Sequence, residues 1–193
     1  LPDVNPELYI QKRKENALRL NKIRETDQVL AAVTYRMKLT QNYGKRDAGL
    51  LKVLDNTIKE FAEDDSIKNS KTFQTRVFRA VSQILIQNRN FTELERFTIA
   101  TYKRFVDEKW FDKNNHESKL QMLIYIVNAL FKNQKYTESL DYAETLGEEM
   151  SAFNNQFYNK YLFFYYNALV INYAHIDLGR GIKALDEMEK EIK

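Results

Sequence analysis

Apolar residues recur every three or four positions along most of this chain, a spacing that places them on one face of an α-helix. The clearest segment has apolar side chains at Leu120, Leu123, Ile124, Val127, Leu130 and Phe131. An earlier segment has them at Val77, Phe78, Val81, Ile84, Leu85 and Ile86. The pattern predicts helical hairpins, with first helices at about 26–43, 71–88, 117–133 and 156–176 and second helices at about 47–62, 92–108, 137–152 and 181–193.

A repeat of 45 residues connects these hairpins, because the segment 88–97 aligns with the segment 133–142. Repeats of this length are typical of helical arrays in which each unit packs on its neighbours. The side-chain oxygens of Thr92 and Thr137 are predicted to cap the second helices of their hairpins. The repeats are expected at about 25–69, 70–114, 115–159 and 160–193, in a single domain that spans 1–193.

An additional helix at 6–24 is predicted to cover the N-terminal end of the array. Pro6 suits the first helical position, and Asn5 suits the cap before it. The chain holds only five glycines and two prolines. Because strands need turns and turns need these residues, the fold class is predicted to be all-α. Apolar residues make up 44% of the chain, which is enough to form a continuous core.

The chain has no cysteine, so it has no disulfide framework and no thiolate metal site. A reducing, cytoplasmic location is expected, and the first residues do not have the pattern of a signal peptide. The chain begins without methionine and ends inside a predicted helix, so we expect a fragment of a longer protein. The net charge of +3 is too small to indicate nucleic-acid binding by itself.

The residues that would support catalysis or cofactor binding are scarce. His116 and His175 are the only histidines, and neither belongs to a zinc-binding or di-iron motif. His116 is expected at the surface. A glycine-rich phosphate loop is also lacking, so we expect no enzyme activity, no metal and no cofactor. Gly147 falls inside a predicted helix, where it costs about 1 kcal/mol against alanine, and a close helix crossing is expected there.

The octapeptide Tyr136-Thr-Glu-Ser-Leu-Asp-Tyr-Ala143 resembles the start of the second helix of a tetratricopeptide repeat. In that family an aromatic residue precedes the helix and a small residue follows three positions later. Phe91-Thr-Glu-Leu94 is similar, with leucine at the small position. The period of 45 exceeds the family's 34, and no proline closes the unit. The resemblance implies a right-handed α-solenoid of tandem antiparallel hairpins that acts as a protein- or peptide-binding scaffold.

In the family, one face of each first helix lines a concave binding surface. The resemblance therefore implies partner-binding roles for Arg76, Arg79, Gln83, Gln87, Gln121, Asn128, Lys132, Tyr166 and Tyr173. Ile124, Leu169 and Asp177 share these faces. Amide side chains can hydrogen-bond an extended peptide, and arginine can bind a carboxylate through two nitrogens. The alternative is that Arg76 and Arg79 only solvate their helix and pair with Glu93 or Glu95.

Two other features leave alternatives open. The predicted first helix is basic, at Lys12, Arg13, Lys14, Arg19, Lys22 and Arg24. This is typical of a solvated face, but also of a surface that binds nucleic acid or an acidic partner. The segment 158–173 is unusually aromatic, which favours helix packing in the core. An exposed aromatic patch that docks a ligand or a second copy is the alternative, and it would make this chain an oligomerisation domain.

Overall fold

The structure is a computed structural model that describes residues 5–43, 52, 56 and 70–192. These residues form helices joined by turns and include no strand, which confirms the predicted all-α class. The chain divides into two compact units, Leu1–Asn88 and Arg89–Lys193. The boundary between the units falls inside the predicted repeat 70–114.

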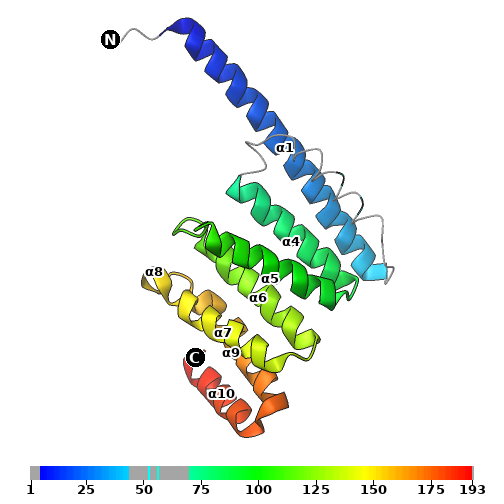
Figure 1. The fold of residues 1–193 in the computed structure, drawn as a ribbon, viewed down its shortest axis with the longest axis vertical. Coiled ribbons are helices and arrows are strands. Elements are labelled where there is room, and N and C mark those ends of the chain that lie inside the picture. Colours follow the sequence, from blue (N-terminus) through cyan, green and yellow to red (C-terminus); the bar gives the residue numbers. More distant parts are fainter. Residues whose placement is uncertain (1–4, 44–51, 53–55, 57–69, 193) are drawn as a thin grey trace. The chain divides into compact units, whose positions relative to one another are not determined.

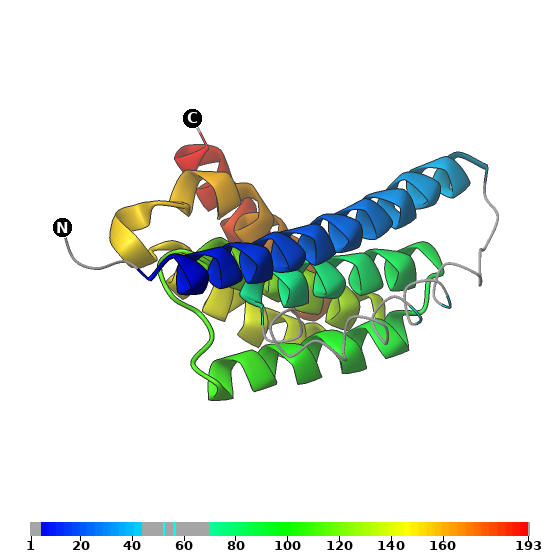
Figure 2. The ribbon, with the colours of Figure 1, turned by 90° about the horizontal axis from the view of Figure 1, so that it is seen from above.

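The first unit contains α1 (Pro6–Tyr43) and α4 (Lys71–Gln87), which pack on each other. Helix α1 is continuous over 38 residues, so the predicted division into helices at 6–24 and 26–43 is wrong. Figure 2 shows α1 as one unbroken ribbon. No glycine or proline lies between residues 7 and 43 to interrupt it. The start of α1 is confirmed, because the side chain of Asn5 accepts a hydrogen bond from the Glu7 N–H at 3.0 Å. The predicted helix 47–62 lies almost entirely outside the described residues.

The second unit is a succession of long helices in which each packs on the next long helix (Figure 1). Its helices are α5 (Phe91–Asp107), α6 (His116–Lys132), α7 (Tyr136–Met150), the short α8 (Ala152–Asn155), α9 (Tyr158–Ile176) and α10 (Leu178–Glu191). The long helices begin within two residues of their predicted positions except α10, which begins three residues earlier. The reason is Asp177, whose side chain accepts a hydrogen bond from the Arg180 N–H and caps the helix.

The helix caps in this unit differ from the prediction. Helix α5 is capped by Asn90, whose side chain accepts a hydrogen bond from the Glu93 N–H at 3.3 Å. Thr92 therefore lies inside the first turn, and Thr137 lies inside the first turn of α7 in the same way. The prediction placed both caps two residues too late. In α5 the Asn90 side chain before the helix reaches the free N–H groups, whereas Lys135 before α7 makes no side-chain cap hydrogen bond.

The period of the repeat changes within the second unit. The starts of α5 and α7 are 45 residues apart, whereas the starts of α7 and α10 are 42 apart, as are those of α6 and α9. The shorter connection between α7 and α9 contains three left-handed residues, Phe153, Asn154 and Asn155, with φ of 53°, 60° and 60°. An alignment at a constant offset of 45 therefore misplaces residues of α9 by three positions, almost one helical turn.

The core of the second unit is assembled from the inner faces of all its long helices. Its most deeply buried side chains include Leu94, Phe105, Leu120, Leu123, Ile126, Leu130 and Leu146. Gly147 lies where α7 passes α9, and a Cβ atom added there would lie 2.7 Å from the Tyr165 ring. The close helix crossing predicted at Gly147 is confirmed. It explains why a residue that weakens the helix stands at this position.

Candidate functional site

Helix α6 presents its predicted partner-binding residues on one face. Gln121, Asn128 and Lys132 are separated by seven and four residues, so they lie in one line along the helix. Gln121 and Asn128 are half-buried and Lys132 is exposed. The side chain of Gln121 donates a hydrogen bond to Glu117 at 3.2 Å, which extends this polar line toward the start of the helix.

The two residues of α9 that were predicted to bind a partner are buried. Tyr166 and Tyr173 are 8% and 7% exposed, so both belong to the core and neither lies on an open surface. At the observed offset of 42, Phe163 and not Tyr166 stands at the position of Gln121, and Tyr166 stands at that of Ile124. The outward face carries Phe163 and Phe164, which are 55% and 45% exposed, with ring centroids 5.9 Å apart. The aromatic run is therefore divided between core tyrosines and an exposed phenylalanine pair.

Side chains of α6 and α9 form one surface, which we call the α6–α9 face. The two helices are joined across it by the ion pair between the Lys160 ammonium and Glu117, at 2.5 Å. The Tyr161 hydroxyl donates a second hydrogen bond to Glu117 at 3.2 Å. We define the α6–α9 face by Glu117, Gln121, Asn128 and Lys132 of α6 and by Lys160, Phe163, Phe164 and Asn167 of α9. The last three follow Lys160 by three, four and seven residues, so they lie on the side of α9 that Lys160 shares.

The other predicted residues lie in the first unit, on α4. Arg76 forms an ion pair with Asp27 of α1, and both side chains are partly exposed. Its partner is thus neither Glu93 nor Glu95. Arg79 and Gln87 are half-buried and Gln83 is exposed. Arg76 already has an acidic partner, so it is a poorer candidate for binding a carboxylate than the sequence indicated.

The basic residues of α1 are exposed in its N-terminal half. The exposed members of the set are Lys12, Arg13, Lys14, Arg19 and Arg24, and Lys22 is half-buried. This arrangement suits a solvated helix or a binding surface for an anion, so the nucleic-acid hypothesis stays a prediction.

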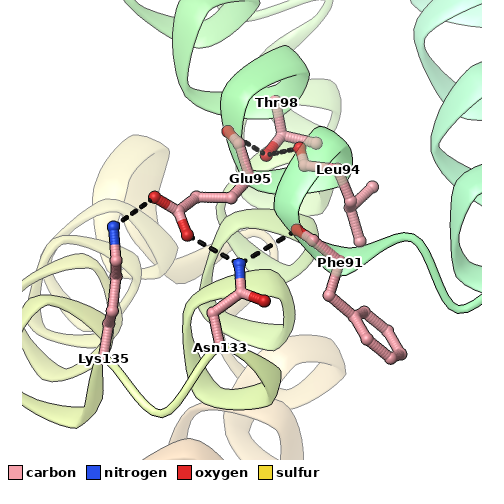
Figure 3. A network of polar contacts seen from close by, with 6 residues as sticks. All are labelled: Phe91, Leu94, Glu95, Thr98, Asn133 and Lys135. Carbon is pink, nitrogen blue, oxygen red and sulfur yellow. Dashed lines mark hydrogen bonds and ion pairs between the residues drawn. The ribbon is translucent and has the colours of Figure 1, made fainter.

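A polar network that the sequence did not reveal holds α5 to the turn between α6 and α7 (Figure 3). The amide of Asn133 donates to the Phe91 carbonyl at 3.0 Å and to the Glu95 carboxylate at 2.7 Å. The ammonium of Lys135 contacts the other oxygen of Glu95 at 2.6 Å. Burial raises the pKa of Glu95, but the hydrogen bonds from Lys135 and Asn133 outweigh it and leave the pKa below its ordinary value. The network therefore fixes the position of the turn on α5.

His116 is buried, so the expectation of a surface histidine is wrong. It is 3% exposed at the start of α6, and its Nε2 lies 2.7 Å from the carbonyl oxygen of Glu149 near the end of α7. Because a carbonyl oxygen only accepts, Nε2 carries a proton. The Glu149 carboxylate is held by the Lys119 ammonium at 2.5 Å. These contacts join the start of α6 to the end of α7, and the ring of Phe153 lies against His116 at 4.9 Å.

Because the Tyr102 side chain is buried, we expect the protein to lose stability at alkaline pH. Burial, together with the charges of Glu149 and Tyr142, raises the pKa of Tyr102 to about 12. The unfolded chain ionises this group near pH 10, so between these values only the unfolded state has lost the proton. The free energy of unfolding therefore falls as the pH rises. We expect the free energy of unfolding of Tyr102→Phe to fall by roughly 2–3 kcal/mol less than that of the wild type between pH 8 and 12. Urea unfolding at several pH values measures both.

The control for this prediction is the same comparison between pH 7 and 9, where Tyr102 is protonated in both states. The difference between the wild type and Tyr102→Phe must be constant there. A difference that stays constant up to pH 12 would show that the Tyr102 hydroxyl is not buried as described.

The described residues contain no group of three or more histidine, aspartate or glutamate side chains that could hold a metal ion. No helix in the described part of the chain is long and apolar enough to cross a membrane. No protein-family model, curated protein or solved structure matches this chain.

Proposed function

We propose that this chain is a non-catalytic protein-binding module, a tetratricopeptide-like right-handed α-solenoid, and that it binds an extended peptide on the α6–α9 face. The observation that carries the proposal is the exposed pair of Phe163 and Phe164. Their helix is anchored in the core on its other side by Leu162, Tyr166 and Leu169. Aromatic rings grouped on a rigid helix bury a large apolar area when a partner covers them, which favours binding.

The polar side chains beside the phenylalanine pair suit a peptide backbone. Gln121, Asn128 and Asn167 each carry an amide that both donates and accepts hydrogen bonds. Backbone N–H and C=O groups of an extended peptide need both kinds of partner. The combination favours a peptide with an apolar anchor residue seated on Phe163 and Phe164, and the amides would hold its main chain.

The helices behind this face are fixed before any partner arrives. Gly147 allows α7 to approach the Tyr165 ring of α9 closely, and Lys160 is paired with Glu117 of α6. Binding to a preorganised surface avoids the entropy cost of ordering it, so a small set of contacts gives useful affinity.

The test begins with selection of peptides from a random display library on the immobilised chain. The affinity of the best peptides is then measured by fluorescence anisotropy for the wild type and for a Phe163→Ser/Phe164→Ser variant. We expect the variant to bind at least ten-fold more weakly, since anchors of this kind usually carry more than about 1.4 kcal/mol. Val106→Ser is the matched control, because Val106 is 43% exposed and lies on α5, which contributes no residue to the α6–α9 face. Circular dichroism must show that all variants fold.

An unchanged affinity in the Phe163→Ser/Phe164→Ser variant would contradict the proposal. An Arg76→Glu/Arg79→Glu variant then distinguishes the alternatives. Loss of binding in that variant alone would assign the peptide to α4 of the first unit. If no peptide is selected above background, the proposal that this chain binds peptides is contradicted.

A second function is favoured by the exposed basic residues of α1. If Lys12, Arg13 and Lys14 bind the phosphates of nucleic acid, affinity must fall steeply with salt concentration. A titration of single-stranded RNA at several salt concentrations measures this directly. Binding that is salt-independent, or unchanged when the three residues become alanine, would exclude it.

A further inference from the structure

Glu117 is the residue through which α6 and α9 are tied together on the α6–α9 face. A single oxygen of its carboxylate, Oε1, accepts three hydrogen bonds. The donors are the Gln121 amide at 3.2 Å, the Lys160 ammonium at 2.5 Å and the Tyr161 hydroxyl at 3.2 Å. Lys160 and Tyr161 belong to α9, whereas Gln121 follows Glu117 by one turn of α6. Glu117 is thus fixed by α9 and in turn holds the side chain of Gln121.

The hydrogen bond to Glu117 determines which way the Gln121 amide points. An ionised carboxylate only accepts hydrogen bonds, so the group of Gln121 that meets it must be the NH₂ group. The Lys160 ammonium and the positive end of the α6 dipole both stabilise the ionised form of Glu117. If the Gln121 amide turned over, its carbonyl oxygen would face the carboxylate and a charge-assisted hydrogen bond would be lost.

The carbonyl oxygen of Gln121 is therefore held at one place on the face. Gln121 is half-buried, and its carbonyl oxygen accepts no hydrogen bond from any described residue. Asn128 differs, because its side chain makes no hydrogen bond within the described residues and its amide can turn to donate or to accept. Of these two amides of α6, only that of Gln121 has a fixed orientation.

Two contacts show that α6 and α9 run side by side in the same direction. In their first turns Glu117 meets Lys160, and in their last turns the ring centroids of Phe131 and His175 are 5.7 Å apart. Helices that touch at both starts and at both ends are parallel. The residues of these two contacts are 43 and 44 positions apart in the sequence, so the register is nearly constant along the pair.

Gln121 consequently lies beside the phenylalanine pair. It is one turn beyond Glu117 in α6, and Phe163 and Phe164 are one turn beyond Lys160 in α9. An apolar anchor seated on the two rings brings its own main chain against the Gln121 carbonyl oxygen. That oxygen loses its contact with water when the peptide covers it, and it needs a hydrogen bond from the peptide in exchange.

We propose that Glu117 is a positioning residue, which holds the Gln121 carbonyl oxygen so that the α6–α9 face selects peptides with a free main-chain N–H group next to the apolar anchor. This role rests on the proposed peptide binding, and it adds the chemistry of the recognised segment. Proline has no N–H group, so proline is excluded from that one position of the peptide. A peptide without the N–H group leaves the Gln121 oxygen covered and without a donor.

Replacement of Glu117 by glutamine removes the constraint. A glutamine side chain donates as well as accepts, so the Gln121 amide can pair with it in either orientation. The face then offers either an NH₂ group or a carbonyl oxygen beside the phenylalanine pair, and the preference for a peptide N–H group should weaken. The informative quantity is this preference and not the affinity itself, because loss of the Lys160 ion pair alone would weaken all peptides alike.

The test uses the tightest peptide selected on the immobilised full chain, and a series in which each main-chain amide is replaced in turn by an ester, which has no N–H group. Fluorescence anisotropy measures the affinity of each. For the wild type we expect the ester at one position next to the apolar anchor to weaken binding about ten-fold. In Glu117→Gln the same ester should weaken binding less than about three-fold relative to the parent peptide.

Two further variants are matched controls. Glu138→Gln makes the same change of charge in the first turn of α7, which contributes no residue to the α6–α9 face, and it should keep the full loss. Tyr161→Phe removes another hydrogen bond to Glu117 but leaves the one from Gln121, so it should keep the full loss as well. Circular dichroism must show that each variant folds.

An equal effect of the ester in the wild type and in Glu117→Gln would overturn the proposal, as would a wild type that tolerates the ester at every position near the anchor. A preference that is lost in Tyr161→Phe would also overturn it, because the effect would then come from the contact between the helices. In these cases, peptides that still depend on Phe163 and Phe164 leave the proposed function intact. Peptides that bind equally well to Phe163→Ser/Phe164→Ser would contradict the proposed function and this role of Glu117 together.

Discussion

Replacing Phe105 by alanine is expected to lower the free energy of unfolding of the second unit by about 3–5 kcal/mol. The Phe105 side chain is fully buried and stacks on Trp110 with ring centroids 3.8 Å apart. Phe111 meets the same ring edge-on at 6.0 Å. Removal of the ring leaves a cavity at the end of α5, where the connection to α6 begins. A loss of this size is a large part of the stability of a small domain.

Trp110 makes this prediction convenient to measure, because it is the only tryptophan in the chain. Its fluorescence reports on unfolding of the Phe105 cluster, and the urea concentration at the midpoint should fall sharply in Phe105→Ala. Val106→Ala is the matched control on the same helix, with an exposed side chain, and should change the stability by less than about 1 kcal/mol. Equal effects of the two substitutions would show that Phe105 is not in the core.

The Glu95 network is expected to have the next largest effect. Glu95→Ala should lower the free energy of unfolding by about 2 kcal/mol at pH 7, because it leaves the Asn133 amide without its charged acceptor. Lys135 is itself 44% exposed, so water replaces part of its ion pair and limits the loss. Urea unfolding of the wild type, Glu95→Ala, Lys135→Met and the double variant measures the coupling between the two residues.

The ionisation of the Glu95 carboxyl group should also make the free energy of unfolding depend on pH in the acidic range. Its pKa in the folded protein lies below the unfolded value, so its stabilising contribution is complete above the unfolded pKa of about 4.3. The contribution is lost as the pH falls through the folded pKa. The difference between the wild type and Glu95→Gln should therefore be largest near neutral pH and should shrink below about pH 4. A difference that grows on acidification would contradict the network.

Local properties of the chain were predictable from the sequence alone. The period of three to four residues located α4, α5, α6 and α7 within two residues, because helix formation and the burial of one helix face depend on residues three or four positions apart. The scarcity of glycine and proline identified the all-α class. The crossing at Gly147 was predictable too, since a glycine inside a helix is unfavourable unless a neighbour needs the space.

Properties that join distant parts of the chain were decided by tertiary structure. Helix α7 is two residues shorter than α5 and its connection to α9 is one residue shorter than that between α5 and α6, so the period changes from 45 to 42. Phe163 then stands where Gln121 stands in α6, and Tyr166 and Tyr173 lie in the core. Glu95 meets partners 38 and 40 residues away, and His116 meets a carbonyl 33 residues away. The identity of a residue does not encode such partners. They depend on loop conformation and helix packing, which bring together groups that no local pattern connects.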